Sequence, residues 1–268
     1  MTLMLKNDIT YIDIGKRITD LALTVYVKSL LYPSRTVNYG VLYNRINELR
    51  KLGSIKFLHI RGNPIILGKG HSSIVVMVRK DGLDLALKIR RIDSNKPDFY
   101  EEVRYMKLAN SINVGPKLYN YSSNFILMEY IRGIPIGKFL RINQLDENKV
   151  GRIIYQILLQ GFQLDSINLI HLQLSNADKH IIIKEEKTFI LDWGKATISL
   201  SRSNVSQLVS FFFISKKSWT NMLLKIFEIK DIKGVLSAIR RYKKKRDKST
   251  FIQLINVLNL DNYGAAGI

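Results

Sequence analysis

The first sixty residues contain two stretches in which apolar residues recur at the spacing of a helix, residues 18–31 and residues 41–52. Gly53 is a typical helix stop, and an apolar run over residues 54–60 then indicates a strand. Two helices and a strand with scattered Arg and Lys over residues 1–62 are compatible with a winged-helix module, in which a helix enters a DNA groove. A helical cap on the following domain fits the same pattern, so both alternatives stay open.

Between residues 63 and 131 the pattern changes to short apolar segments separated by turns. The Lys-Asp-Gly turn at residues 80–82 is typical of a hairpin. The expected elements are a strand–turn–strand segment over 65–76, a strand over 85–89, a helix over 98–110, and strands over 114–118 and 125–131. Together they predict a small lobe of antiparallel strands with one inserted helix.

Residues 132–268 are mainly helical in pattern. The expected helices cover 150–169, 206–214, 219–227, 231–242 and 251–260, and residues 195–206 are expected to form a loop. The stretch at residues 171–194 interrupts this pattern and predicts a polar loop followed by two short apolar strands around a charged turn. The chain is therefore predicted to be an α+β protein in three parts, residues 1–62, 63–131 and 132–268.

Composition narrows the classes of protein that this pattern allows. The hydrophobic content of 46% supports a sizeable core, and the absence of cysteine excludes disulfides, zinc–thiolate sites and thiol nucleophiles. It also fits a reducing cytosol. No long apolar run follows a basic start at the N-terminus, and the apolar run at residues 211–214 is far too short to span a membrane. A soluble cytoplasmic protein without a membrane partner is expected.

The charge balance is strongly basic, with 42 Lys and Arg residues against 22 Asp and Glu residues, a formal net charge of +20. Such a balance favours phosphate-rich partners, which include nucleotides and nucleic acids. The dense basic run at residues 240–246, together with residues 1–62, could contact RNA, DNA or a ribosome. A lysine-rich surface and a solvated helix end explain the same charges, so these alternatives also stay open.

Two carboxylates flank the predicted hairpin within residues 171–194. Asp178 lies in the polar loop before the first strand, Asp192 follows the second strand, and Gly194 comes shortly after it. Paired carboxylates beside a glycine suit a divalent cation that carries phosphates. This stretch therefore predicts a site for a nucleotide and its metal ion.

A glycine turn and a lysine within an apolar strand of the preceding lobe are the predicted phosphate-binding elements. Gly68 and Gly70 flank Lys69 in a strand–turn–strand segment, where glycines let the backbone approach a phosphate closely. The segment lacks the lysine–serine pair and the helix of a P-loop, which disfavours that class. Lys88 lies in an apolar alternation, where an unpaired ammonium is costly. Glu102, near the start of the next helix, is the candidate partner.

In their order and spacing, these motifs resemble those of the protein kinase-like fold. The matching stretches are residues 66–75 for the glycine-rich loop, with Ser73 where a third glycine often lies, residues 85–88 for the lysine strand, Glu102 for the helix glutamate, residues 127–131 for the hinge, and residues 192–194 for the Asp-Phe-Gly motif. The resemblance covers residues 65–260 and implies two lobes, a small antiparallel-sheet lobe and a helical lobe.

More narrowly, the His-Leu-Gln-Leu-Ser loop at residues 171–175 and the Asp-Trp-Gly-Lys motif at residues 192–195 resemble the RIO-type and related atypical kinases. They are most similar to an archaeal group of predicted serine/threonine protein kinases. No Ala-Pro-Glu motif follows Gly194, so a long peptide-docking activation segment is not expected. Some RIO relatives carry an N-terminal winged helix, which by analogy favours that alternative for residues 1–62.

The resemblance implies an ATP- and Mg²⁺-dependent serine/threonine protein kinase with an unidentified protein substrate. Catalytic roles fall on Lys88, Gln173, Asp178 and Asp192, and the two aspartates would bind Mg²⁺. Glu102 would position Lys88 against the α- and β-phosphates. The implied nucleotide-binding residues are Gly68, Lys69, Gly70, Ser73, Val75, Ala86, Lys88, Glu102, Met128, Glu129 and Ile131.

Two positions depart from the kinase pattern. Asp178 stands where kinases have a metal-binding asparagine, and a carboxylate binds magnesium at least as well. Gln173 stands where they have the catalytic aspartate, and an amide cannot accept the proton of the substrate hydroxyl. A positioned base contributes roughly 10²- to 10⁴-fold, but phosphoryl transfer depends mostly on positioning and charge neutralisation. The alternatives are a slow kinase, an ATPase in which Gln173 orients water, and a nucleotide-binding pseudokinase scaffold. His171 is expected to anchor the loop.

Overall fold

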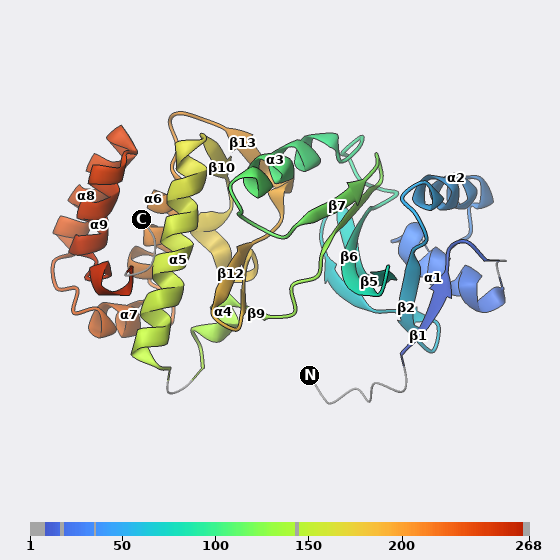
Figure 1. Ribbon diagram of the computed structural model, residues 1–268, viewed down its shortest axis with the longest axis horizontal. Helices are drawn as coiled ribbons and strands as arrows, with labels where there is room; N and C mark the ends of the chain where they lie inside the picture. Colours follow the sequence, from blue (N-terminus) through green and yellow to red (C-terminus); the bar gives the residue numbers. More distant parts are fainter. Residues whose placement is uncertain (1–8, 17–18, 35, 143–144, 265–268) are drawn as a thin grey trace. The chain divides into compact units, whose positions relative to one another are not determined.

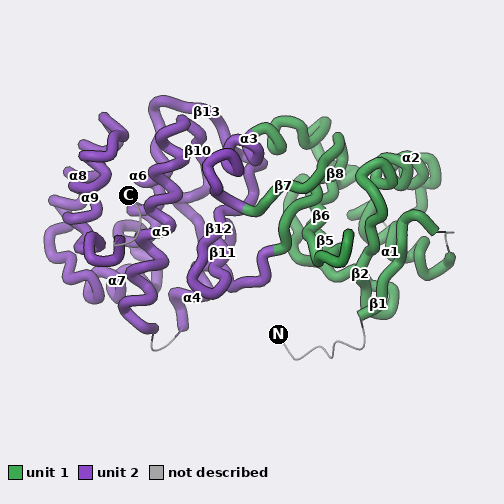
Figure 2. Tube along the Cα trace, in the orientation of Figure 1, with its two compact units in different colours: residues 1–104, 116–130 green, residues 105–115, 131–268 purple. Residues whose placement is uncertain are grey.

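The computed structural model describes residues 9–16, 19–34, 36–142 and 145–264 (Figure 1). The predicted start of the first helix, at residue 18, lies outside the described residues. The chain divides into two compact units (Figure 2). Unit 1 comprises residues 1–104 and 116–130, and unit 2 comprises residues 105–115 and 131–268.

Unit 1 is built on an antiparallel sheet in which the strand order is β1-β2-β5-β6-β8-β7, while β3 pairs with β2 and β4 pairs with β5 (Figure 1). The strands are β1 (Thr10–Asp13), β2 (Lys56–Ile60), β3 (Asn63–Pro64), β4 (Ile66–Lys69), β5 (Ser73–Lys80), β6 (Leu83–Arg90), β7 (Leu118–Tyr121) and β8 (Phe125–Glu129). Asp81 and Gly82 join β5 to β6 with positive φ angles of 49° and 78°, the conformation of a tight hairpin turn. The predicted hairpin at this point is confirmed.

The N-terminal segment contributes to the same core as this sheet. Helices α1 (Asp20–Leu30) and α2 (Tyr39–Arg50) bury their apolar faces in one cluster with β5, β6 and β8, and Tyr26 meets Phe57 edge to face at 5.6 Å between ring centroids. Strand β2 pairs with both β1 and β5, so the segment extends the sheet. The predicted boundary at residue 62 and the winged-helix alternative stay predictions.

The predicted inserted helix is α3 (Tyr100–Ser111). The strand predicted over residues 114–118 is wrong, since β7 begins only at Leu118. Asn113 adopts a left-handed φ of 58° after α3, and the backbone N–H of Val114 donates to the carbonyl of Ala109 at 2.9 Å. These residues therefore cap the helix instead of extending a strand.

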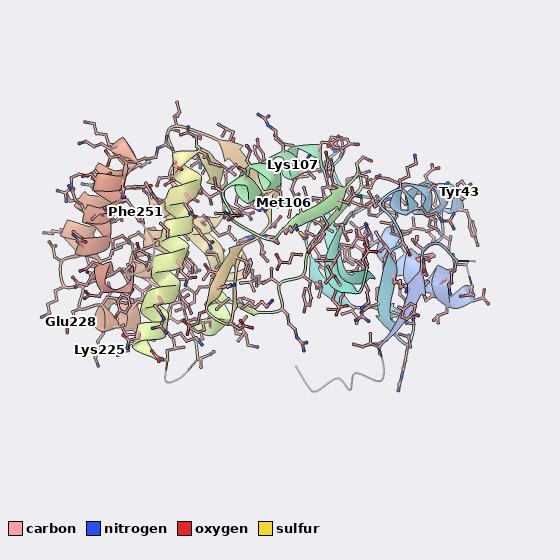
Figure 3. The ribbon with its side chains drawn as sticks, in the orientation of Figure 1. Tyr43, Met106, Lys107, Lys225, Glu228 and Phe251 are labelled. Atoms are coloured by element: carbon pink, nitrogen blue, oxygen red, sulfur yellow. The ribbon has the colours of Figure 1, made fainter. Side chains whose placement is uncertain are left out.

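Unit 2 is mainly helical (Figure 1). Its helices are α4 (Ile136–Phe139), α5 (Glu147–Ser166), the 3₁₀ turns η2 (Leu174–Lys179), η3 (Trp193–Lys195) and η5 (Asp261–Tyr263), α6 (Asn204–Val209), the π-helix η4 (Ser210–Ile214), α7 (Thr220–Ile226), α8 (Ile232–Lys245) and α9 (Lys248–Val257). Two small sheets accompany them, β12-β11-β9 and β10-β13, made of β9 (Ile134–Pro135), β10 (Leu169–His171), β11 (Ile181–Lys184), β12 (Lys187–Ile190) and β13 (Ala196–Ile198). Phe251 of α9, which is labelled in Figure 3, stacks on Phe162 of α5 at 4.6 Å between ring centroids.

Several predicted boundaries in unit 2 differ from the structure. The closing helix, expected over residues 251–260, is α9 and covers Lys248–Val257, because Asp247 caps its start and Asn259 adopts a left-handed φ of 51° after its end. The helix expected over residues 150–169 ends at Ser166, because Asn168 adopts a left-handed φ of 59°, and the apolar residues after it form β10. The loop expected over residues 195–206 contains β13, which pairs with β10, and the start of α6. Both β10 and β13 have only three residues, which is too short for their alternation of apolar and polar residues to be recognised in the sequence.

The α+β fold class with a sheet unit and a helical unit is confirmed, and the hairpin predicted within residues 171–194 is the β11–β12 pair. Across the part of the chain that the structure describes, the helices are all too short or too polar to cross a membrane.

Candidate active site

The Lys88 ammonium forms a buried ion pair with Glu102 in unit 1. Its Nζ contacts Glu102 Oε1, and the side chains are only 7% and 5% exposed. The Nζ of Lys96 lies 3.9 Å from the other carboxylate oxygen, and Lys88 lies over the Phe99 ring at 5.8 Å. Removing Lys88 would take from the buried Glu102 carboxylate its nearest positive charge, which is strongly unfavourable. The structure thus brings together the two residues that the sequence paired.

Strand register places Lys88 on one face of the sheet with three other predicted nucleotide-binding residues. Val75 lies directly opposite Lys88, and Ala86 lies directly opposite Met128. Residues opposite each other, and residues two apart along one strand, share a face. The alternate residues of β5 and β6 are enclosed in the core of unit 1. Lys88 therefore projects from the face that the core does not use.

The β4–β5 hairpin holds the glycine turn. The N–H of Gly70 donates to the Ser73 carbonyl at 2.8 Å, and Arg91 Nη1 donates to the Gly70 carbonyl at 3.0 Å. A Cβ added at Gly68 would meet no atom within 4 Å. Packing within the protein therefore does not require glycine at this position, and the space beside it is open to a ligand. Lys69 extends over the ring of Tyr32, 5.5 Å from its centroid.

In the predicted hinge, the backbone N–H of one residue is already hydrogen-bonded within the protein, and the side chain of another is buried. The backbone N–H of Glu129 donates to the Lys117 carbonyl at 2.8 Å, so this group is not available to a base. The side chain of Ile131, in unit 2, is buried. The predicted adenine contacts of Glu129 and Ile131 stay predictions.

His171 anchors the polar loop in unit 2. Its Nε2–H donates to the Leu191 carbonyl at 2.9 Å, and its Nδ1 accepts from the N–H of Gln173 at 3.3 Å, an assignment of the ring proton that follows from these partners. Burial lowers the pKa of His171 to about 4. The neutral imidazole of His171 therefore makes two hydrogen bonds, which join the loop to the segment before Asp192, as expected for an anchor.

A buried carboxylate that the sequence did not reveal holds the same loop from the other side. Asp165 of α5 accepts from the backbone N–H and the side-chain amide of Asn204, at 2.7 and 2.8 Å, and from the hydroxyls of Ser203 and Tyr242. The Asn204 amide also donates to the Leu169 carbonyl. Burial raises the pKa of the Asp165 carboxyl more than these hydrogen bonds lower it. Strand β10, and with it the start of the loop, is thereby connected to α5 and α6.

Asp178 is held between two cations. Its Oδ1 accepts from Arg141 Nη2 at 3.1 Å, and its Oδ2 accepts from Lys217 Nζ at 3.2 Å. Lys217 also donates to Asn176 Oδ1 at 2.9 Å. Gly137 makes room for this arrangement, since a Cβ there would lie 2.3 Å from Asp178 Oδ1. Neither cation was singled out from the sequence, because Arg141 and Lys217 lie 37 and 39 residues away from Asp178.

Asp192 has a different environment. Its backbone adopts a left-handed conformation with φ of 70°, and its side chain is 47% exposed. The Nδ1 of His180 lies 4.0 Å from Asp192 Oδ2, and the N–H of Leu191 donates to the His180 carbonyl at 2.7 Å. Gln173 is half-buried at the start of η2, and no described group hydrogen-bonds to its side-chain amide.

These surroundings bear on whether the site fits Mg²⁺. This ion keeps several waters and binds proteins through one or two carboxylates, with substrate phosphates completing its shell. The half-exposed carboxylate of Asp192 fits such a role, whereas both oxygens of Asp178 are engaged by cations. Among the described residues, no group of three or more His, Asp or Glu side chains forms a preassembled metal site. A metal here needs ligands from its substrate.

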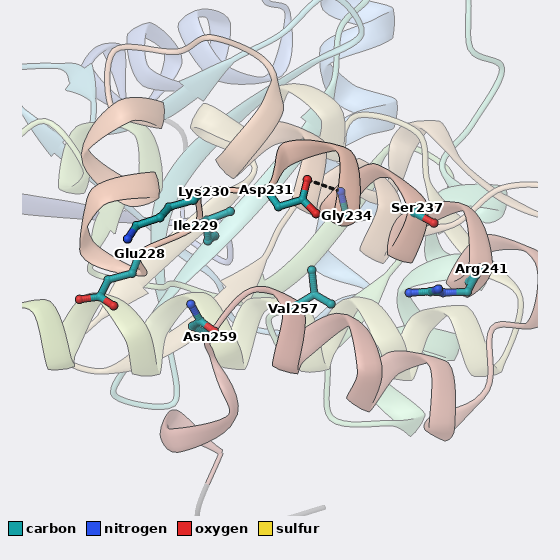
Figure 4. Close-up of a pocket in the computed structure, with 9 residues that line it drawn as sticks. All are labelled: Glu228, Ile229, Lys230, Asp231, Gly234, Ser237, Arg241, Val257 and Asn259. Carbon is teal, nitrogen blue, oxygen red and sulfur yellow. Dashed lines mark hydrogen bonds between the residues drawn. The ribbon is translucent and has the colours of Figure 1, made fainter.

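The basic run at residues 240–246 is only partly available to a partner. Tyr242 is buried and donates to Asp165, and Arg246 donates to the Ser199 carbonyl at 3.2 Å and to Asn168 Oδ1 at 2.8 Å. The remaining members of the run are exposed, namely Arg240, Arg241, Lys243, Lys244 and Lys245. A pocket of about 430 Å³ also lies in unit 2 (Figure 4) and is lined by Glu228, Ile229, Lys230, Asp231, Gly234, Ser237, Arg241, Val257 and Asn259. None of the predicted catalytic or nucleotide-binding residues lines it.

Comparison with known proteins agrees with these motifs. The family model of the RIO domain matches residues 84–210. An uncharacterized protein of Methanocaldococcus jannaschii is 26% identical over 121 residues, which is 44% of this chain and 99% of that protein. The autoinhibited serine kinase domain of the giant muscle protein titin superposes with a TM-score of 0.51 at 13% identity, covering 73% of this chain and 78% of the titin domain.

Proposed function

On the premise that the chain has a RIO-type, protein kinase-like fold, we propose that it binds ATP with Mg²⁺ and transfers the γ-phosphoryl group to a serine or threonine hydroxyl of a protein. The observation that carries the proposal is the buried pair of Lys88 and Glu102. A lysine fixed by a carboxylate on a sheet face outside the core serves little purpose for stability, since apolar residues would fill the same space equally well.

Unit 1 would hold the nucleotide. Lys88 would bind the α- and β-phosphates, and Glu102 would keep its ammonium in place. The glycine turn at Gly68 and Gly70 would approach the phosphates with its backbone. Val75, Ala86 and Met128 would contact the base from the same sheet face, with the remaining predicted nucleotide-binding residues around them.

Unit 2 would hold the metal and the acceptor. Asp192 would bind Mg²⁺, which when bound neutralises charge on the transferred phosphoryl group. The prediction that Asp178 shares this ion stays a prediction. Gln173 would orient the acceptor hydroxyl through its amide. The backbone before it is fixed by His171 and by Asn204, which Asp165 holds in place. An amide takes no proton, so we expect slow turnover.

Nucleotide binding tests this proposal directly. We expect isothermal titration with a non-hydrolysable ATP analogue to show Mg²⁺-dependent binding, and Lys88→Met to weaken it about tenfold or more through loss of a charge-assisted contact. Lys51→Met, at an exposed lysine directly after α2, is the matched control and should bind like the wild type. Absence of binding to the wild-type chain, or equal binding by both variants, rejects the proposal.

Gln173 supports a second candidate, an ATPase or a nucleotide-binding scaffold. A glutamine can orient a water for attack on the γ-phosphate. Phosphate release and phosphate transfer should be measured side by side for the wild type and for Gln173→Asp. Release without transfer in the wild type favours the ATPase, and a large gain of transfer in Gln173→Asp favours the scaffold.

The exposed basic residues at the end of α8 support a nucleic-acid contact as an additional role. Arg240, Arg241, Lys243, Lys244 and Lys245 are all exposed. Binding through phosphates weakens steeply as salt increases. We expect RNA or DNA affinity to fall with salt and to fall further when Lys243, Lys244 and Lys245 are changed together to Gln. Affinity that does not depend on salt rules out this role.

A further inference from the structure

We propose that the second protein ligand of the metal is Nδ1 of His180, beside Asp192, and that Asp178 is instead held by the ammonium of Lys217. The inference rests on the proposed function, because it concerns the metal of the same site. It assigns His180 a role that the motif positions give to Asp178.

The hairpin register fixes His180 next to Asp192. Ile181 pairs with Ile190 at the open end of β11–β12, and the N–H of Leu191 donates to the His180 carbonyl one step further along. The next residue on that side is Asp192. Its Oδ2 lies 4.0 Å from His180 Nδ1. Backbone pairing therefore holds His180 opposite Leu191, the residue before Asp192, and the left-handed conformation of Asp192, with φ of 70°, sets where its carboxylate lies.

The separation of these two atoms suits two ligands of one ion. Metal–ligand bonds from imidazole nitrogen or carboxylate oxygen are about 2.0–2.2 Å long, so two donors on one octahedral ion lie about 3.0 Å apart when they are adjacent and about 4.2 Å apart when they are opposite each other. The observed 4.0 Å is close to the separation of opposite ligands. The His180 side chain is only 18% exposed and its ring lies against that of His171, 5.5 Å between centroids, which limits the orientations it can adopt.

Asp178 has neither oxygen available for such an ion. Lys217 and Arg141 each contact one of its carboxylate oxygens. Both cations are held by further contacts, Lys217 by Asn176 and Arg141 by the Gly137 carbonyl at 2.7 Å and the face of Trp219 at 4.9 Å. A divalent cation at Asp178 would face two positive charges at short range. Lys217 thus supplies at Asp178 the positive charge that a second metal ion would otherwise provide.

The donor types also predict which ion is preferred. A site with one imidazole nitrogen and one carboxylate suits Mn²⁺ better than Mg²⁺, which takes oxygen ligands. We therefore expect the chain to bind Mn²⁺ more tightly than Mg²⁺. An asparagine at residue 180 would supply an oxygen in place of the nitrogen and should weaken this preference.

Binding of Mn²⁺ to the full chain, followed by electron paramagnetic resonance with and without a non-hydrolysable ATP analogue, tests the inference. We expect Asp192→Asn and His180→Ala each to weaken Mn²⁺ binding about tenfold or more, and Asp178→Asn to change it less than about twofold. Pulsed spectra of bound Mn²⁺ should show coupling to an imidazole nitrogen in the wild type and lose it in His180→Asn. His180→Asn should also shift the preference from Mn²⁺ towards Mg²⁺, an effect that a purely structural role of His180 does not produce.

The opposite results overturn the inference. They are loss of Mn²⁺ binding in Asp178→Asn with no loss in His180→Ala, absence of nitrogen coupling in the wild type, or absence of Mn²⁺ binding under both conditions. Thermal unfolding of each variant separates a lost ligand from a lost fold. If the wild type binds Mn²⁺ with nitrogen coupling but does not bind the ATP analogue, the proposed function fails while the assignment of His180 stands.

Discussion

The side-chain amide of Asn204 donates to the buried carboxylate of Asp165 at 2.8 Å, and its carbonyl oxygen accepts the backbone N–H of His171 at 2.8 Å. One side chain of α6 thus connects a carboxylate on α5 with the strand that begins the polar loop. The position of Gln173 depends on this connection, because His171 in turn accepts from the N–H of Gln173.

Asp165→Ala should lower the free energy of unfolding by about 3 kcal/mol or more, since it leaves the donors of Ser203, Asn204 and Tyr242 buried without an acceptor. Urea unfolding followed by circular dichroism measures the change. The matched control is Asp261→Ala, at an exposed aspartate, for which we expect a change within about 0.5 kcal/mol. Equal changes in the two variants would show that the network does not hold the loop.

Stability and nucleotide binding should respond differently to changes at the buried ion pair. Lys88→Met should destabilise unit 1 by about 3–5 kcal/mol, because it leaves the buried Glu102 carboxylate without its nearest positive charge and with only the more distant Lys96 ammonium at 3.9 Å. The double variant Lys88→Met, Glu102→Leu should recover most of this loss and still not bind the ATP analogue. Thermal unfolding and titration of the same samples measure both quantities. Recovery of nucleotide binding in the double variant would contradict the role of Lys88.

The stability of the chain should fall in mild acid because of His171. Burial lowers its pKa from 6.5 in the unfolded chain to about 4 in the folded protein. Between these values the unfolded state binds the proton and the folded state does not, so the free energy of unfolding decreases as pH falls from 6.5 to 4. The shift corresponds to a loss of about 3 kcal/mol at 1.36 kcal/mol per pKa unit. Urea unfolding at pH 7, 5.5 and 4.5 measures this loss.

The control for this titration is the exposed His71. The wild type and His71→Gln should lose stability in parallel as the pH falls. In His171→Gln, the decrease in the free energy of unfolding that protonation of His171 causes between pH 6.5 and 4 should be absent, although this variant is less stable than the wild type at pH 7. A profile of His171→Gln that still parallels the wild type would mean that this histidine is not the group that titrates.

Alanine substitutions at two glycines should distinguish a glycine needed for ligand binding from a glycine needed for packing. At Gly68 an added Cβ meets no atom within 4 Å, so Gly68→Ala should change stability by less than about 1 kcal/mol. At Gly133 it would lie 2.2 Å from the Ile183 carbonyl oxygen, so Gly133→Ala should cost about 1–3 kcal/mol through backbone displacement. Titration with the ATP analogue should show weaker binding for Gly68→Ala. Unchanged affinity would remove the glycine turn from the proposed phosphate site.

Features that depend on local spacing could be predicted from the sequence. The hairpin of β11 and β12 follows from two apolar runs around a charged turn, and the pair of Lys88 and Glu102 follows from the cost of an unpaired lysine in an apolar strand. The strand predicted over residues 114–118 was wrong because Asn113 ends α3 in a left-handed conformation, a common role of asparagine that the pattern of apolar residues does not show.

Contacts between distant segments could not be predicted in this way. Asn204 meets Asp165 across 39 positions, and Lys217 meets Asp178 across another 39. Nothing in the periodicity of either segment indicates its partner, because only tertiary packing brings them together. His180 is a similar case. The metal role of Asp178 stays a prediction of the motif, whereas the 4.0 Å separation of His180 Nδ1 from Asp192 Oδ2 is visible only in the folded chain.

The central claim is that this chain transfers phosphate from ATP to a protein hydroxyl, and transfer of γ-labelled phosphate tests it most directly. The wild type, Lys88→Met and Asp192→Asn should be incubated with labelled ATP, Mg²⁺ or Mn²⁺, and a dephosphorylated protein mixture. We predict metal-dependent label on serine or threonine for the wild type and about 100-fold less for either variant. No label above background in the wild type, or equal label in all three proteins, would contradict the claim.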